Sequence, residues 1–143
     1  MGHHRLDREQ IMTTNPGASG CHRIAKTFGF SASHQLWQLP PEHKCSRDHG
    51  HNYTVTVVLT ADSLDGNGFV TDFGELAPFG EFLANTFDHR VLNEVVSFHP
   101  TSELLAQHLG QWFIEHLEPN IHGRLVSMQV SETETSYAVW ERN

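Results

Sequence analysis

The chain has 143 residues, 38% of them hydrophobic, which suffices for one domain with an apolar core but not for two. Its 9 Lys and Arg against 17 Asp and Glu give a formal net charge of -8, which excludes a general attraction to nucleic acid or anionic lipid. Two cysteines make no disulfide framework, and no apolar run suits a membrane span or a signal peptide, so we expect a cytoplasmic protein. The 12 histidines stand out, because imidazole is a common metal ligand.

The first part of the chain predicts a leader, a strand and a loop. Residues 1–21 are polar and show no sustained hydrophobic period, so we expect a flexible leader before one folded domain over 22–143. From His22 to His34 the side chains alternate in character, which predicts a strand that carries His34 on its apolar face. The polar, proline-containing stretch over 35–48 indicates a loop.

The next segment is the clearest strand in the sequence. Over His49–Thr60 the histidines and most apolar residues fall on one face, whereas glycine, asparagine and threonine fall on the other, with Val58 the exception. The residues of the apolar face are His49, His51, Tyr53, Val55, Val57 and Leu59. A glycine-rich turn over 65–68 follows this strand.

Two amphipathic helices follow. Asp72-x-x-Glu75 resembles a capping box, and Pro78 marks the start of the first regular helix after an opening turn. The second helix begins near Thr101 and is closed by Pro119, with apolar residues at helical spacing between them.

The order strand, strand, helix, helix, strand, strand predicts an α+β fold. The last two strands are expected at 126–132 and 136–142. The strands would form an antiparallel sheet with both helices on one face. The other face would then have apolar character and no helix over it, which favours oligomerisation.

The tripeptide His49-Gly50-His51 is the most informative motif. Two histidines at i and i+2 of a strand share a face, about 6.5 Å apart at Cα, so both can approach one ion. His34 can supply a third nitrogen if the two strands pair. Three protein ligands with an open position are typical of catalytic zinc, whereas structural zinc usually has four ligands that include thiolates. The alternatives are ordinary half-buried histidines, or an iron site of the cupin type, which would place a carboxylate shortly after H-x-H where Asn52-Tyr53-Thr54-Val55 stands.

Cys45 is a candidate proton-transfer group. It lies four residues before His49, between Lys44 and Arg47. Nearby cations and a metal stabilise a thiolate, which can act as a base near neutral pH. The alternative is a small residue in a loop without a chemical role.

Two carboxylates complete the set of candidates. Asp88 is followed directly by His89, and a carboxylate can orient an imidazole for proton transfer. Glu132 shares a predicted strand face with apolar residues, so its charge needs a partner, such as a ligand that donates a pair of N–H groups. Glu134 is the competing candidate for that role.

Six segments resemble, in the same order, the family of 6-pyruvoyl-tetrahydropterin and 6-carboxytetrahydropterin synthases. They span about residues 24–140 and read FGFSASHQL, PEHKCSRDHGHNYTV, FVTDFGEL, FDHRVLN, HPTSE and VSET. The resemblance implies the tunnelling fold, or T-fold, over the domain 22–143. It also implies a homohexamer of two stacked trimers, in which strands of neighbouring chains join into a barrel and active sites lie between subunits.

The same resemblance implies roles for particular residues. The zinc ligands that it implies are His34, His49 and His51. Cys45 corresponds to the catalytic thiol, which works with Asp88 and His89. Glu132 corresponds to the carboxylate that anchors the pterin ring, and Thr101 to a further pterin contact.

Within the family, the spacing between the cysteine and HGH separates the branches. Only Ser46-Arg47-Asp48 stands between them here, which is similar to the carboxy branch of queuosine-type 7-deazapurine biosynthesis. The resemblance therefore implies a zinc-dependent lyase that converts 7,8-dihydroneopterin triphosphate to 6-carboxytetrahydropterin, acetaldehyde and triphosphate. The alternatives are a 6-pyruvoyl-tetrahydropterin synthase, a non-catalytic pterin- or zinc-binding protein, and a mononuclear iron oxygenase.

Overall fold

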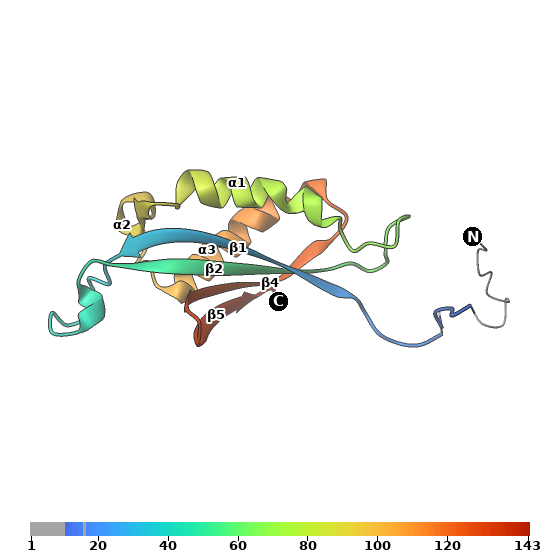
Figure 1. Ribbon diagram of the computed structural model, residues 1–143, viewed down its shortest axis with the longest axis horizontal. Helices are drawn as coiled ribbons and strands as arrows, with labels where there is room; N and C mark the ends of the chain where they lie inside the picture. Colours follow the sequence, from blue (N-terminus) through green and yellow to red (C-terminus); the bar gives the residue numbers. More distant parts are fainter. Residues whose placement is uncertain (1–10, 16) are drawn as a thin grey trace, which may run out of the picture.

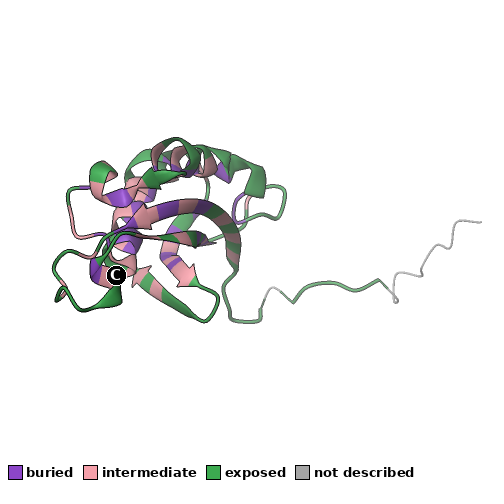
Figure 2. Cartoon of the chain, turned by 60° about the vertical axis from the view of Figure 1, so that its left-hand side comes forward, coloured by how far each residue is buried: buried purple, intermediate pink, exposed green. Residues whose placement is uncertain are grey.

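The computed structural model describes residues 11–15 and 17–143 of the chain. Part of the predicted leader over 1–21 therefore lies outside the described residues, and its flexibility stays a prediction. The leader residues that are described, 11–15 and 17–21, are all exposed (Figure 2).

Within the described residues, five strands form one sheet in the order β3-β1-β2-β4-β5. Figure 1 labels β1, β2, β4 and β5 of this sheet. Their bounds are β1 (Arg23–His34), β2 (His49–Thr60), β3 (Arg90–Val91), β4 (Arg124–Thr133) and β5 (Ser136–Glu141). The four long strands pair antiparallel along the sheet, as the order of the elements predicted. The short strand β3 pairs parallel with β1, so the expectation of a purely antiparallel sheet is wrong at this edge. A two-residue strand is too short to show a hydrophobic period, and the sequence gives no sign of it.

The helices lie over one face of the sheet, as expected. Their bounds are α1 (Ala77–Thr86), α2 (Leu92–Val95) and α3 (Ser102–His116), with single 3-10 turns at η1 (Lys44–Ser46), η2 (Phe73–Leu76) and η3 (Glu118–Asn120). Pro78 lies in the first turn of α1, and the Thr101 side chain caps α3. Asp72 accepts a hydrogen bond from the Gly74 N–H at 2.9 Å, so it caps η2 instead of forming the expected capping box. Within the residues that the structure describes, no helix is long and apolar enough to cross a membrane.

The core lies between the helices and the sheet. On β2, Val55, Val57 and Leu59 are completely buried against the helix layer. On α3, Leu105 and Leu109 are equally buried. Every second residue of β2 therefore points into the core, and this alternation also fixes the direction of the histidines at the start of the strand.

The face of the sheet without helices is polar, which corrects the expectation of an apolar one. The Ser31 hydroxyl donates to the Asn52 side-chain oxygen at 2.7 Å, and the hydroxyls of Thr27 and Thr56 lie 3.3 Å apart. Polar side chains of the neighbouring strands β1 and β2 thus meet in pairs along this face. Most apolar residues of β1 and β2 have the opposite parity and lie on the helix-covered face, and the pair Ala25 and Val58 is the exception.

Candidate active site

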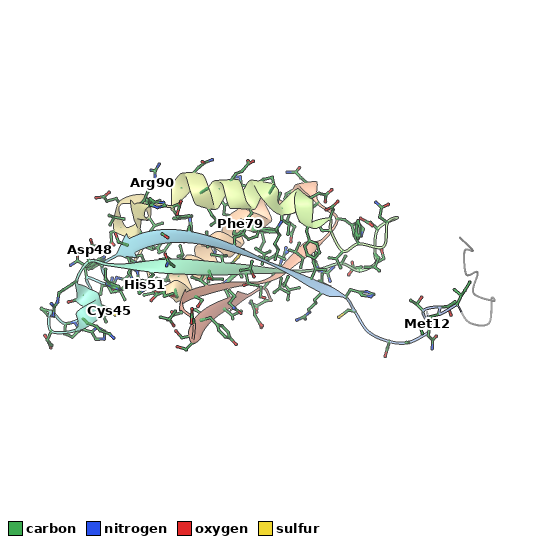
Figure 3. All side chains as sticks on the ribbon, viewed as in Figure 1. Met12, Cys45, Asp48, His51, Phe79 and Arg90 are labelled. Atoms are coloured by element: carbon green, nitrogen blue, oxygen red, sulfur yellow. The ribbon has the colours of Figure 1, made fainter. Side chains whose placement is uncertain are left out.

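Three histidines converge where β1 ends and β2 begins. The strand register places His34 opposite His49 and Ala32 opposite His51, so the three rings lie on the helix-covered face. The Nε2 atoms of His34 and His49 are 3.0 Å apart. One ring nitrogen from each of the three histidines lies within 4.8 Å of the other two. Figure 3 shows His51 on β2, with Asp48 and Cys45 nearer the loop at the end of the sheet.

Backbone carbonyls orient two of the rings. Nδ1 of His34 lies 2.8 Å from the carbonyl oxygen of Pro100, and Nδ1 of His49 lies 2.7 Å from the carbonyl oxygen of Arg47. A carbonyl can only accept a hydrogen bond, so we assign the proton of each neutral ring to Nδ1. The lone pairs of the two Nε2 atoms are then free to bind an ion.

The third histidine supplies a buried nitrogen that needs a partner. Nε2 of His51 is buried and makes no hydrogen bond within the described part of the chain; the nearest carboxylate oxygen, from Glu132, is 3.5 Å away. Burial lowers the pKa of His34 and of His51 below the ordinary value of 6.5, although the Glu132 charge acts in the opposite direction. Neutral imidazole is the form that binds a metal ion. The three nitrogen donors therefore fit a zinc ion with an open coordination position.

Glu132 lies between the histidines and an open pocket of about 550 Å³. Its Oε1 accepts a hydrogen bond from the Ser102 hydroxyl at 2.7 Å and lies 3.9 Å from Nε2 of His34. Thr101 and Ser102 line the same pocket. The competing carboxylate, Glu134, is exposed in the turn after β4. The Glu132 carboxylate therefore lies beside the histidines and also borders a space large enough for a small ligand.

Asp88 and His89 form a pair on the polar face of the sheet. Oδ2 of Asp88 lies 2.8 Å from Nδ1 of His89, while its Oδ1 accepts a hydrogen bond from the Ser31 N–H at 2.9 Å. The Ser31 hydrogen bond, followed by that of His89, lowers the pKa of Asp88 and favours the carboxylate. His89 lines a pocket of about 430 Å³ together with Ser33 and Asn52, and its side chain is 83% exposed.

The backbone of His89 is in a sparsely populated conformation. Its φ is 59°, in the left-handed region that residues with a side chain rarely adopt. The N–H of His89 donates to the carbonyl oxygen of Ser31 at 2.6 Å. Such backbone strain persists only where the surroundings hold it, and it often occurs at functional sites.

Cys45 lies in η1, outside the sheet, and is partly buried (Figure 3). Its N–H donates to Nδ1 of His43 at 3.1 Å, and its carbonyl oxygen accepts from the N–H of Leu36 at 2.9 Å. These contacts tie the loop to the end of β1, close to His34. Cys45 belongs to the loop that leads into the histidine centre, whereas Asp88 and His89 lie beside Ser31 of β1, and no hydrogen bond or ion pair joins the thiol to this pair among the described residues.

Sequence reasoning missed several groups that support the site. The carbonyl of Pro100 and the backbone of Ser31 act through main-chain atoms, which carry no residue-type signal. Ser102 is the first residue of α3, next to the N-cap Thr101, and a serine at a helix start is common without any role in a site. The Tyr53 hydroxyl lies 3.2 Å from Nδ1 of His34, and burial raises the pKa of Tyr53, so it stays protonated there.

The sheet with helices on one face and the three-histidine centre define a T-fold protein. A structure of 6-pyruvoyl tetrahydropterin synthase from Caenorhabditis elegans has the same fold, with a TM-score of 0.74 over 87% of this chain and 97% of that chain at 24% identity. An uncharacterized protein from Wolinella succinogenes has a TM-score of 0.79 over 87% of this chain and 100% of its own, also at 24% identity.

A family model described as 6-pyruvoyl tetrahydropterin synthase matches residues 23–143, so the chain belongs to this family. A 6-carboxy-5,6,7,8-tetrahydropterin synthase from Bacillus subtilis (strain 168) is 34% identical over 129 residues, which cover 82% of this chain and 83% of that protein. The 6-pyruvoyl tetrahydrobiopterin synthase of Homo sapiens is 25% identical over 143 residues, which cover 91% of this chain and 99% of that protein. Relatives of both branches are thus similar over nearly the whole domain.

Proposed function

We propose that this chain is a zinc-dependent lyase that converts 7,8-dihydroneopterin triphosphate and one water molecule to 6-carboxy-5,6,7,8-tetrahydropterin, acetaldehyde and triphosphate. The observation that carries the proposal is the position of Glu132, whose carboxylate lies 3.5 Å from the histidine centre and also lines an open pocket. A pterin offers a carboxylate two N–H groups on one edge. The same ligand can then extend its side chain toward a metal ion held by the histidines.

Two observations favour the carboxy branch over the pyruvoyl branch. Three residues, Ser46-Arg47-Asp48, separate Cys45 from His49, as in the carboxy branch that the sequence resembles. The relative named for the carboxy product is 34% identical to this chain, whereas the human relative named for the pyruvoyl product is 25% identical.

The side chains have separate roles in this proposal. Zinc, held by Nε2 of each histidine, would supply a Lewis acid that polarises an oxygen of the substrate side chain. Glu132, oriented by Ser102, accepts the two N–H groups of the pterin edge. Cys45 removes and returns protons, and His89, held by Asp88, relays them.

The separation of Cys45 from the Asp88–His89 pair supports an assembly in which neighbouring chains share each site. We infer a homohexamer of two stacked trimers, as the family resemblance implies. Within the described residues, β5 is an edge strand whose outer side can pair with another chain, and β1, on its side away from β2, is bordered only by the two residues of β3. Pairing of such edges would close a barrel with the hydroxyl-rich face inside.

The cell compartment and the pathway are also part of the proposal. The two cysteines are free, which suits a reducing cytoplasm. A carboxytetrahydropterin product would serve the synthesis of 7-deazapurines such as queuosine.

The test is a mass-spectrometric product assay. The full chain, loaded with zinc, is incubated with 7,8-dihydroneopterin triphosphate, and a parallel sample contains a chelator. We expect carboxytetrahydropterin and acetaldehyde in equal amounts, and neither product in the chelated sample. A pyruvoyl product would keep the site and overturn the branch. Binding of zinc and pterin without any product would support the non-catalytic alternative.

A further inference from the structure

The hairpin that carries Glu132 also carries an exposed aromatic side chain opposite to it. The pairing of β4 with β5 shifts by one residue between Val130 and Thr133, so two residues of β4 lie opposite one residue of β5. The two residues are Ser131 and Glu132, and the single residue is Tyr137. Such a β-bulge changes the direction of the side chains at its site, and bulges are frequent beside active sites.

Glu132 and Tyr137 border the same space from two strands. Both line the pocket of about 550 Å³ that contains Thr101 and Ser102. Both also line a second pocket of about 650 Å³, which reaches Gly50 at the start of β2. They are the two residues common to both linings, so a ligand held by Glu132 in either pocket lies beside Tyr137.

The fold of one chain does not account for Tyr137. Its side chain is 66% exposed, whereas the other aromatic residue of β5, Trp140, packs so closely on Gly110 that a Cβ there would lie 2.4 Å from the indole. The backbone around Tyr137 is held in place, since the Ser131 hydroxyl lies 2.7 Å from the carbonyl oxygen of Ser136. The hairpin therefore presents a large exposed ring on a backbone that a hydrogen bond holds in place.

A carboxylate alone does not fix a planar ligand. Two hydrogen bonds to Glu132 hold one edge of a fused heterocycle, but the ring can still rotate about that edge. An aromatic side chain on its face removes this freedom and adds stacking energy. We propose that Tyr137 stacks on the face of the pterin ring whose edge Glu132 binds, and so determines affinity for the ring system more than the rate of the chemical steps. This inference rests on the proposed function.

The experiment compares substitutions of Tyr137 in the zinc-loaded full chain. Binding of unsubstituted pterin, which lacks the reactive side chain, is followed by fluorescence titration, and KM and kcat are measured with dihydroneopterin triphosphate. We expect Tyr137→Ala and Tyr137→Leu to weaken pterin binding and raise KM by about tenfold, with kcat within about twofold of wild type. Tyr137→Phe keeps the ring and should bind as the wild type does. Phe73→Ala, which removes an exposed ring 48% accessible in η2, is the matched control.

Zinc content and oligomeric state are measured for every variant. Unchanged pterin affinity in Tyr137→Ala, or full affinity in Tyr137→Leu, overturns the stacking role while the proposed function stands. Weaker binding that accompanies dissociation of the oligomer also overturns it, because Tyr137 would then be a subunit contact. If the wild-type chain itself binds no pterin, the proposed function fails and this inference fails with it.

Discussion

The Nε2 atoms of His34 and His49 lie 3.0 Å apart, while Nδ1 of each ring faces a backbone carbonyl. With the protons on Nδ1, two lone pairs point at each other, which is unfavourable unless a cation lies between them. Nε2 of His51, which is buried and has no hydrogen-bond partner among residues 11–15 and 17–143, completes the group. The positions of these ring nitrogens indicate a metal more directly than the H-x-H spacing does, because the spacing fixes only where the two residues lie along the strand.

The first prediction concerns metal binding. His49→Ala and His51→Ala should each lose zinc, since two nitrogen donors remain of three. Zinc at about 1,000 times its Kd raises the free energy of unfolding of the wild type by about 4 kcal/mol. The variants should lack this stabilisation, so zinc should not raise their Tm. Zinc content and Tm with and without chelator are the measurements. His116→Ala, at an exposed histidine of α3, is the control, and zinc retained in both site variants would contradict the assignment.

The second prediction separates two neighbouring carboxylates. Glu132→Gln replaces a charged acceptor by an amide, and a hydrogen bond to a charged group contributes about 1.5–3 kcal/mol, so pterin affinity should fall by about 10–100-fold. Zinc content should be unchanged. Glu134→Gln removes an equal charge two residues away in the exposed turn and should bind pterin as the wild type does. The reverse order of affinities would identify Glu134 as the anchor.

The third prediction uses the two free cysteines of the chain, Cys21 and Cys45. Cys45→Ala should fold and bind zinc but lose turnover by a factor of about 10² or more, as expected for a lost acid–base group. Cys21→Ala is the control, because Cys21 is exposed before the first strand. Steady-state kinetics with a matched zinc content makes the comparison. Wild-type kcat in Cys45→Ala would remove the thiol from the mechanism.

The fourth prediction concerns pH and the metal-free chain. Burial lowers the pKa of His34, His51 and His108 below the ordinary value of 6.5 in the folded state. Below that value the unfolded chain binds protons that the folded chain does not, so the free energy of unfolding should fall as the pH decreases through about 6.5 and stay nearly constant above it. Denaturant unfolding between about pH 8 and pH 5.5 tests this, in a range above the titration of ordinary carboxyl groups. His108→Gln should reduce the slope, and a gain of stability on acidification would contradict the prediction.

Particular residues show which parts of the site could be predicted from the sequence. Alternation along β1 and β2 predicted that His34, His49 and His51 share a face, because a period of two fixes side-chain direction. It could not place His89, whose position depends on a left-handed backbone and on hydrogen bonds to Ser31. Main-chain groups and non-local contacts leave no pattern in residue types.

The same limit explains the other differences. Strand β3 has two residues, and the bulge opposite Tyr137 depends on how β4 and β5 pair, so neither has a local signal. The threonines of β2 share one parity, so the sequence already indicates a polar face. The expectation of an apolar face left this parity out of account. Pairing between strands decides these features, and pairing is a property of the folded chain.

The fifth prediction tests whether two chains share each site. Cys45→Ala and His89→Ala should each be inactive alone, because each removes one member of the proton-transfer set. If the thiol comes from one chain and the imidazole from its neighbour, chains mixed in equal amounts and refolded together contain complete sites. Half of the thiol positions and half of the imidazole positions are intact, so about a quarter of wild-type activity should return.

The matched control for this experiment is a mixture of Cys45→Ala with His51→Ala. Cys45 lies in the loop before β2, and His51 lies in β2, so one chain would supply both residues to the same site. In this mixture every chain lacks one of the two residues, so no site is complete. This mixture should stay inactive. Mass spectrometry of the intact oligomers confirms that the chains have mixed. A mixture of Cys45→Ala and His89→Ala that is fully mixed but inactive would show that the two residues do not meet across a subunit boundary, and the shared-site assembly would have to be abandoned.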